Sequence, residues 1–308
     1  MDPTQGTPIT ISDKPLFDSY FKKYPPEISE LTFTNLFIWR KYYDFLFLEY
    51  KDHLIVYSKT FSKKKWKTNE IHRNDTLYFL PPIGVSPDLI LIELTKNLDH
   101  IEFHKVPEQL TEKINQNRNL GDSRIEIVDD RDNWDYVYEI KDLINLPGNK
   151  YRQNRRWLTK FLSAYNYEFS VITEDSINIC KKLQLEWRVR KGCMDNEALY
   201  GEQIAINEAL EHFKELNYKG GLLCVGDNCV GFTFGEMLNE HDLVIHIEKA
   251  HNEFEGSYQA INHLFLKICY PDVQFVNREQ DLGVLGMKKA KESYKPHHMV
   301  KKKIIVKK

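Results

Sequence analysis

The alternation of apolar and polar residues along the chain predicts short helices and strands that occur twice in the same order. Each half predicts one helix, three strands, and then a helix, a strand, a helix and a strand. The residues do not repeat but the order does, which indicates a duplicated α+β unit. In the first half the predicted elements are Leu31–Tyr43, Asp44–Tyr50, His53–Lys59, Thr76–Leu80, Pro87–Leu98, Ile101–Val106, Pro107–Asn117 and Arg124–Val128. In the second half they are Glu202–Leu216, Gly221–Val225, Val230–Met237, Asp242–Ala250, Ser257–Tyr270, Val273–Val276, Gly286–Tyr294 and Met299–Val306.

A turn signal separates the two halves at Leu146–Asn149, of sequence LPGN. A helix with a strong apolar stripe is predicted directly after it, at Lys150–Tyr165. We therefore predict an N-terminal domain of residues 1–148 and a C-terminal domain of residues 149–308, each a mixed, mainly antiparallel sheet flanked by helices. The stripe of the helix is Leu158, Phe161, Leu162 and Tyr165.

The net charge of the chain is slightly negative, so the molecule as a whole does not attract nucleic acid. The chain has 308 residues, 29% of them charged and 42% apolar, and a net charge of −2, so any such binding needs a local basic patch. The predicted helix Lys150–Tyr165 carries one, since Arg152, Arg155, Arg156 and Lys160 share a face. This face is either an ordinary solvated helix surface or a contact for phosphate or an RNA backbone such as that of tRNA.

The apolar runs, the N-terminal segment and the cysteines together predict a cytoplasmic protein. No apolar run approaches the length of a membrane span, and Met1–Lys14 does not have the pattern of a signal peptide. The cysteines are odd in number and scattered, which is typical of free thiols in a reducing compartment, although two of them could face each other across a hairpin. No second Cys or His pair completes a zinc set, so we predict no metal. The cysteines are Cys180, Cys193, Cys224, Cys229 and Cys269, and the two at the hairpin are Cys224 and Cys229.

The richest candidate chemistry lies in Val273–Tyr294, where a short buried strand is followed abruptly by polar residues, two glycines and a basic helix. Polar groups at the carboxyl end of a strand are where ligands bind in α/β proteins. The helix is predicted to turn Met287, Ala290 and Tyr294 inward. A strand-to-helix turn held by a structural Arg–Asp pair is the alternative. The polar residues are Asn277, Arg278, Glu279, Gln280 and Asp281.

Several segments together resemble the phosphatidylglycerol lysyltransferase C-terminal domain family, over residues 15–306. The segments that carry the resemblance are Thr34–Arg40 (TNLFIWR), Leu146–Lys150 (LPGNK), His246–His251 (HIEKAH), Gly256–Asn262 (GSYQAIN) and Asn277–Gly283 (NREQDLG). The resemblance implies two tandem GNAT-like (acyl-CoA N-acyltransferase-like) domains, and the predicted order of elements is that of the GNAT fold. The namesakes of the family are membrane proteins whose soluble part transfers an aminoacyl group from charged tRNA to a lipid headgroup.

GNAT enzymes hold the diphosphate of the acyl donor in a glycine-rich loop before a helix. The matching loop here, His251–Gly256, has a single glycine, and Glu253 and Glu255 oppose an anion there. Acetyl-CoA is therefore disfavoured as a cofactor. The resemblance to the family implies aminoacyl-tRNA as the alternative donor. The residues at this loop that we predict to bind a cofactor are Gly256, Ser257 and Tyr258, although Ser257 is equally suited to cap the helix.

The remaining candidate residues are expected to meet where the strands Asp242–Ala250 and Val273–Val276 diverge, with Arg278 close to Glu248. The equivalent N-terminal positions are poorer, because Pro81 and Pro82 lack N–H donors. The predicted catalytic residues are Glu248, Arg278 and Glu279, with Arg278 stabilising negative charge and a carboxylate, or His246, taking a proton. The predicted substrate-binding residues are His246, Asn252, Gln259, Asn262, Asn277 and Asp281.

These residues leave three functions open. The first is an acyl or aminoacyl transferase acting on an amine or hydroxyl of a small polar acceptor. The second is a non-catalytic ligand-binding protein on a degenerate tandem GNAT fold, which the incomplete diphosphate loop favours. The third is RNA binding, with a basic surface formed by Arg152, Arg155, Arg156, Lys288, Lys289 and Lys291.

Overall fold

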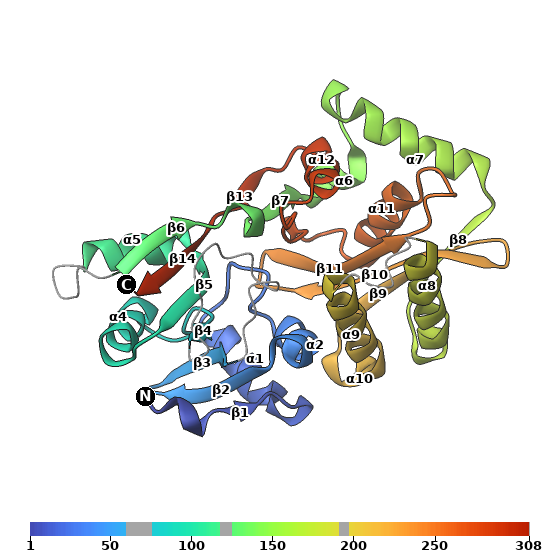
Figure 1. Cartoon of the computed structure of the whole chain (residues 1–308). Coiled ribbons are helices and arrows are strands. Elements are labelled where there is room, and N and C mark those ends of the chain that lie inside the picture. The colour runs from blue at the N-terminus through green and yellow to red at the C-terminus, as the bar shows by residue number, and fades with distance from the viewer. Residues whose placement is uncertain (60–75, 118–124, 191–196, 308) are drawn as a thin grey trace. The chain divides into compact units, whose positions relative to one another are not determined.

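Seven strands form the sheet of the first of two compact units (Figure 1). The computed structural model describes residues 1–59, 76–117, 125–190 and 197–307, and the first unit consists of Met1–Trp134 with Val300–Lys308. Its strands lie in the order β1-β2-β3-β4-β5-β14-β6. They are β1 (Thr7–Pro8), β2 (Phe45–Tyr50), β3 (His53–Ser58), β4 (Leu77–Phe79), β5 (Ile101–Pro107), β6 (Ile125–Asp129) and β14 (Lys302–Lys307). The helices described in this unit are α1 (Lys14–Lys23), α2 (Phe33–Tyr43), α4 (Pro87–Asn97) and α5 (Glu108–Gln116).

The second unit, Asp135–Met299, contains a sheet with the order β13-β7-β12-β11-β10-β9-β8. Its strands are β7 (Asp135–Glu139), β8 (Tyr167–Val171), β9 (Lys219–Val225), β10 (Asn228–Met237), β11 (Asp242–Ala250), β12 (Phe275–Asn277) and β13 (His298–Val300). Its described helices are α6 (Ile140–Asn145), α7 (Arg152–Ala164), α8 (Ile177–Arg190), α9 (Glu197–Glu211), α10 (Phe213–Leu216), α11 (Ser257–Cys269) and α12 (Leu285–Ser293).

The two sheets have the same arrangement of parallel and antiparallel strands when the strand order of the second sheet is taken from β8 to β13. Each has a parallel ladder, β4 with β5 and β11 with β12, and the strands that precede it along the chain pair antiparallel as a meander. The predicted α+β class, with two mixed and mainly antiparallel sheets flanked by helices, is confirmed. The repeated order of elements in the sequence corresponds to this repeated sheet.

One strand of each sheet comes from an unexpected part of the chain. In the first sheet the strand between β5 and β6 is β14, from the end of the chain. In the second sheet the strand between β12 and β13 is β7, which directly follows the first unit in sequence. The units therefore divide at residues 134/135 and 299/300 and not at the predicted 148/149. The pattern did not predict β7, because its sequence DYVYE has a polar residue at each end and is buried at four consecutive positions, so it does not alternate.

The core of the second unit lies between its sheet and α11, against which α6 and α7 pack. Helices α8 and α9 cover the other face, where α8 contacts β10 and β11 (Figure 1). The stripe predicted for α7 is confirmed, since Leu158 and Phe161 are buried and Leu162 and Tyr165 pack against the same core. Burial of this stripe is what fixes α7 on α11.

The expectation that all cysteines are free thiols is wrong for one pair. Cys224 and Cys229 lie opposite each other in the β9–β10 hairpin and form a disulfide. Cys180 and Cys269 are free, as predicted, and Cys193 lies outside the described residues. The hairpin turn brings the two sulfurs together because the intervening residues form a tight connection.

We predict that Ile305→Ala in β14 destabilises the first unit by about 2–4 kcal/mol, because Ile305 is fully buried in that sheet's core. Its neighbour Ile304 is only half-buried, so Ile304→Ala is expected to cost less than about 1.5 kcal/mol. Urea denaturation of both variants measures the difference. Equal losses for the two would contradict the placement of β14 inside the first sheet.

Candidate functional site

Strands β11 and β12 run side by side for three residue pairs and then separate. The last pair of the parallel ladder is Val244 with Asn277. Beyond it the chain after β12 turns to β7, where Arg278 N donates to Tyr136 O at 2.9 Å. The gap that opens between the two strands is bridged by side chains, and most of the predicted catalytic residues lie there.

The first bridge across the gap is an ion pair. Arg278 Nη2 donates to Glu248 Oε1 at 2.8 Å, and Asn262 Nδ2 on α11 donates to Glu248 Oε2 at 2.8 Å. Both oxygens of Glu248 are therefore engaged, and the Arg278 and Glu248 side chains are only 14% and 11% exposed. The predicted proximity of Arg278 and Glu248 is observed.

The second bridge is a histidine between two carboxylates. His246 Nδ1 lies 3.1 Å from Glu279 Oε1, and its Nε2 lies 3.0 Å from Glu236 Oε1 on β10. Burial alone lowers the pKa of this imidazole, but the hydrogen bonds to both carboxylates outweigh it and raise the pKa to about 9. His246 is therefore an imidazolium at neutral pH, so it supplies positive charge and cannot act as the general base that the sequence suggested.

A lysine and two tyrosines enclose Arg278 from the other side. Lys291 Nζ donates to the backbone oxygens of Arg278 and Glu279, and burial followed by repulsion from Arg278 lowers the pKa of Lys291 to about 8. The rings of Tyr138 and Tyr294 lie 5.8 Å and 5.0 Å from the Arg278 guanidinium, within cation–π range. These contacts hold the arginine in one position beside the gap.

Glu279 has a left-handed backbone, with φ of 57°. This conformation is uncommon for residues other than glycine and often marks functional sites. However, Lys105 has φ of 59° two residues beyond the last parallel pair of the first sheet, Phe79 with Phe103, which is the same position relative to the ladder. The conformation thus belongs to the way this fold separates two parallel strands and is not by itself a sign of catalysis.

Two predicted substrate-binding residues, Asn277 and Asp281, are 1% exposed and have internal partners. Asn277 Nδ2 donates to Asp135 Oδ2 at 3.0 Å, and its Oδ1 accepts from Glu279 N at 2.8 Å. Asp281 accepts from the Tyr136 hydroxyl at 2.6 Å and from Gly283 N at 2.7 Å. These bonds fix the loop that carries Arg278.

The start of α11 is covered by α7. Gly256 has φ of 88°, and a Cβ added there would lie 2.2 Å from the backbone oxygen of Trp157 on α7. Lys160 on α7 forms an ion pair with Glu255 of the same turn. Ser257 is buried and donates to His251 O at 2.9 Å. The turn before α11 is therefore packed against α7 at Gly256, with Lys160 and Glu255 paired beside it.

The other predicted residues near α11 lie apart from the gap or at its edge. Tyr258 is half-buried, and its hydroxyl accepts from Trp187 Nε1 on α8 at 3.1 Å. Asn252 is exposed on the turn. Gln259 is half-buried and hydrogen-bonds the hydroxyl of Tyr294.

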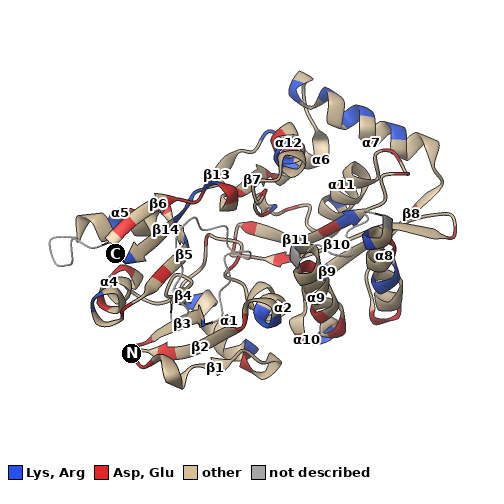
Figure 2. Ribbon diagram, in the orientation of Figure 1, with Lys and Arg blue, Asp and Glu red and all other residues tan. Residues whose placement is uncertain are grey.

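Figure 2 shows Lys and Arg positions along α7, and one of the predicted arginines is engaged within the chain. Arg155 Nη1 donates to the backbone oxygens of Leu146 and Gly148, so it closes the turn after α6. Arg152 and Arg156 are exposed. Two of the three arginines remain available to an external anion.

The sequence missed Glu236, Tyr138 and the inward role of Lys291. Glu236 lies on β10, and only the register of β10 with β11 places it beside His246. Tyr138 lies on β7, which was not predicted. Lys291 was interpreted as a surface charge, although it follows the predicted inner position Ala290 by one residue. No single-sequence signal marks a carboxylate on the neighbouring strand as the partner of a histidine.

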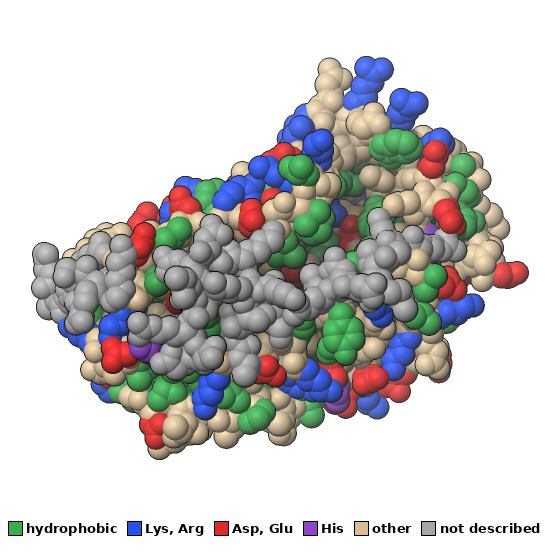
Figure 3. All heavy atoms as spheres, viewed as in Figure 1, with side chains coloured by type: hydrophobic (Ala, Val, Ile, Leu, Met, Phe, Trp, Pro, Cys, Tyr) green, Lys and Arg blue, Asp and Glu red, His purple; other side chains and the backbone are tan. Residues whose placement is uncertain are grey.

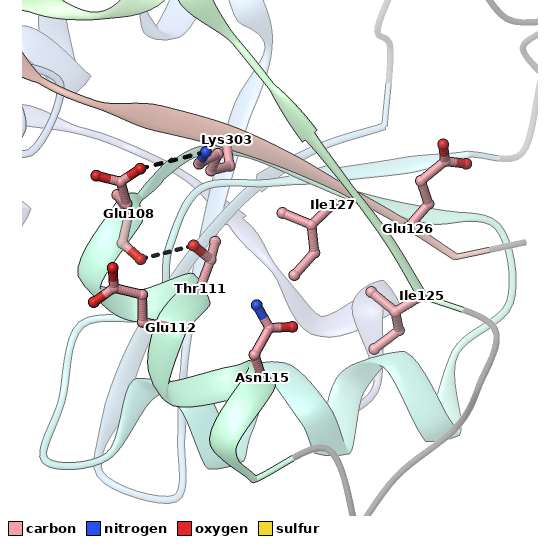
Figure 4. A pocket seen from close by; sticks show the side chains of 8 residues that line it. All are labelled: Glu108, Thr111, Glu112, Asn115, Ile125, Glu126, Ile127 and Lys303. Atoms are coloured by element: carbon pink, nitrogen blue, oxygen red, sulfur yellow. Dashed lines mark hydrogen bonds and ion pairs between the residues drawn. The ribbon is translucent and has the colours of Figure 1, made fainter.

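An open hollow of about 560 Å³ lies on the first unit, between α5 and β6 (Figure 4). Three glutamates and Lys303 line it together with smaller polar and apolar side chains, and Lys303 contacts Glu108. It contains none of the predicted site residues. Over the described part of the chain, no three His, Cys, Asp or Glu side chains are grouped as metal ligands, and every helix is too short or too polar to cross a membrane. The lining residues are Glu108, Thr111, Glu112, Asn115, Ile125, Glu126, Ile127 and Lys303.

The two sheets with their separating parallel strands define a tandem GNAT-like protein. The chain belongs to the phosphatidylglycerol lysyltransferase C-terminal family, whose model matches residues 21–306. A conserved protein of unknown function from Bacteroides thetaiotaomicron has a similar structure, with TM-score 0.86, 29% identity and 99% of both chains covered. The C-terminal domain of a proposed lysylphosphatidylglycerol synthetase from Agrobacterium fabrum shares the fold, with TM-score 0.63, 8% identity and coverage of 97% of this chain and 92% of that one.

Among curated proteins, an uncharacterised protein of Mycoplasmoides gallisepticum is 27% identical over 176 residues. The match covers 55% of this chain and 55% of that protein, so the alignment spans about half the length of the curated relative.

We predict that His246→Gln lowers the unfolding free energy by on the order of 3 kcal/mol at pH 6 and by much less at pH 10. The pKa of His246 is raised from 6.5 to about 9, so its stabilisation is fully present below pH 6.5 and is lost as the pH rises through 9. Denaturation of wild type and variant across this range measures the difference. The exposed His297→Gln should follow the wild-type profile, and a pH-independent loss for His246→Gln would contradict the imidazolium.

We predict that Gly256→Ala lowers the unfolding free energy by about 2–4 kcal/mol, since the new methyl group meets the Trp157 carbonyl in a strained backbone. Gly226 also has positive φ, 54°, but no atom lies within 4 Å of its added Cβ. Gly226→Ala is therefore the matched control, with an expected loss of about 1 kcal/mol. Similar denaturation midpoints for both variants would show that α7 does not pack against this turn.

Proposed function

We propose that this protein transfers an aminoacyl group from a charged tRNA to an amine or hydroxyl of a polar acceptor, with the reaction at the gap between β11 and β12. Membership of the lysyltransferase C-terminal family supports the class of reaction. The location of the reaction is proposed from the surroundings of Arg278. Glu248 holds Arg278 at the gap, and the Nη1 atom of Arg278 is buried without a hydrogen-bond partner among the described residues. An unpaired guanidinium nitrogen costs free energy unless a ligand oxygen satisfies it.

In the proposed reaction the acceptor attacks the ester carbonyl carbon of the aminoacyl-tRNA. Negative charge then develops on the carbonyl oxygen, where Arg278 donates from Nη1 and the His246 imidazolium adds positive potential. Glu279 takes the proton of the acceptor, the bond to the ribose oxygen breaks, and that oxygen receives the proton. Glu248 is the less suited base, because Arg278 and Asn262 occupy both of its oxygens, and we assign it the positioning of Arg278.

The donor is the second part of the proposal. Acetyl-CoA is disfavoured because α7 covers the start of α11 and Glu255 is paired there with Lys160. For tRNA, Arg152 and Arg156 are the residues of α7 whose side chains are exposed for phosphate contacts. Arg155 is not part of this proposal, because it holds the turn at Gly148.

Ligand binding without turnover is the second candidate. The observation that favours it is that the chain's own ion pairs bridge the gap, so a substrate must enter beside Glu248–Arg278 and His246–Glu279. In that case Arg278 binds an anionic group and no bond is exchanged.

We predict that the protein forms aminoacyl hydroxamate from lysyl-tRNA, or from total tRNA charged with labelled amino acids, when hydroxylamine serves as the acceptor. Arg278→Lys keeps the charge beside Glu248 but loses the fork of donors, so its rate is expected to fall about 100-fold. Glu279→Gln removes the base and is expected to lose about 100-fold or more. Release of label from tRNA measures both.

Lys182→Ala on α8 is the control, because its side chain is 78% exposed and should leave the rate unchanged. Circular dichroism of each variant separates loss of rate from loss of fold. Wild type that releases no label above the protein-free rate, from any charged tRNA, would refute the transferase and leave the binding protein. Micromolar calorimetric binding of acetyl-CoA would refute the choice of donor.

A further inference from the structure

The segment around the start of α12 exposes apolar side chains that a globular protein normally buries. Within six positions Leu282, Val284, Leu285 and Met287 are 44%, 50%, 72% and 37% exposed. Helix α12 buries none of its own residues, so the predicted inward positions Met287 and Ala290 are exposed, whereas the predicted inward Tyr294, which follows the helix, is buried. Clusters of this kind mark a surface that meets another apolar phase.

Lysines follow this apolar segment directly. Lys289 and Lys295 are exposed and Lys288 is partly exposed, while Glu292 is the one acidic residue of the helix and lies 4.0 Å from Lys288. The segment 282–295 therefore combines an apolar end with a net positive charge. Figure 3 shows hydrophobic and basic side chains together over this part of the molecule.

The helix is also held firmly from below. Tyr294 is buried, the Tyr138 hydroxyl donates to Lys291 O at 2.9 Å, and Lys291 Nζ donates to the carbonyls of Arg278 and Glu279. Because these contacts lie at the end of α12 and beneath it, its first turn is presented outward in a fixed position. A preformed surface loses little conformational freedom when it binds.

We propose that residues 282–295 dock this protein on the surface of an anionic lipid bilayer. The apolar side chains Val284, Leu285 and Met287 enter the boundary between headgroups and acyl chains, and Lys288, Lys289 and Lys295 contact lipid phosphates. An RNA backbone fits the lysines but offers nothing to a leucine that is 72% exposed. The proposal goes beyond the aminoacyl transfer and does not depend on it, since it needs no reaction at the gap.

The test is cosedimentation of the full chain with vesicles of phosphatidylcholine containing about 30 mole per cent of phosphatidylglycerol or, separately, of phosphatidylserine. Both anionic vesicles are expected to bind, pure phosphatidylcholine is not, and binding should weaken as salt is raised. Val284→Ser with Leu285→Ser should lower the partition coefficient about tenfold. Lys288→Gln with Lys289→Gln should lower it about fivefold for each lysine.

Ile268→Ser is the matched control, because Ile268 is 52% exposed on α11 outside the segment, and its variant should bind as wild type does. Equal binding of wild type and the Val284/Leu285 variant would overturn the proposal, as would equal binding to pure phosphatidylcholine. Binding to phosphatidylglycerol but not phosphatidylserine would indicate a headgroup subsite in place of a docking surface. A wild type that self-associates by light scattering, without binding vesicles, and a variant that is monomeric would assign the surface to a second copy of the chain.

Discussion

The chemistry of the opening between β11 and β12 depends on buried charges that satisfy one another. Backbone pairing ends at Val244 and Asn277, and two side-chain bridges, Arg278 with Glu248 and His246 with Glu279, span the strands beyond that point. Charged groups in such a place are costly to desolvate, and they are tolerated because each has a partner at hydrogen-bond distance. The removal of one partner leaves its counterpart buried and unpaired, so these residues are expected to act as one unit and not as independent contributions.

The first sheet opens in the same way, with different residues. Its parallel strands also separate after three pairs, and Lys105 has the same left-handed backbone as Glu279. The buried polar contacts nearby are the hydrogen bond of His104 with Glu102 and the ion pair of Lys302 with Glu30. The opening is therefore a property of the fold, whereas the chemistry is a property of the residues placed in it. For that reason the function proposed for this protein depends on Arg278 and its neighbours and not on the GNAT-like sheet itself.

The sequence predicted most of the architecture and only part of the site. Alternation along Asp242–Ala250 and the repeated order of elements were enough to place Glu248 near Arg278, because a parallel neighbour aligns the carboxyl ends of two strands. The pattern could not predict that β14 joins the first sheet and β7 the second. Pairing between strands that are distant in sequence does not depend on local periodicity. Helical periodicity was wrong for Met287 and Ala290 of α12 and right for Tyr294, because a stripe of apolar residues does not reveal how far a neighbouring surface extends along it. Arg155 shared a basic face with Arg156, but its long side chain reaches back to a carbonyl, which spacing does not show.

Helix α12 connects the exposed apolar surface to the gap through a single ammonium group. Lys291 belongs to the same short helix as Leu285 and donates to the carbonyls of Arg278 and Glu279. Burial and the nearby charge of Arg278 lower the pKa of Lys291 to about 8. Any partner that displaces α12 therefore acts on the backbone of the residue proposed to stabilise negative charge, through contacts that are continuous in the structure.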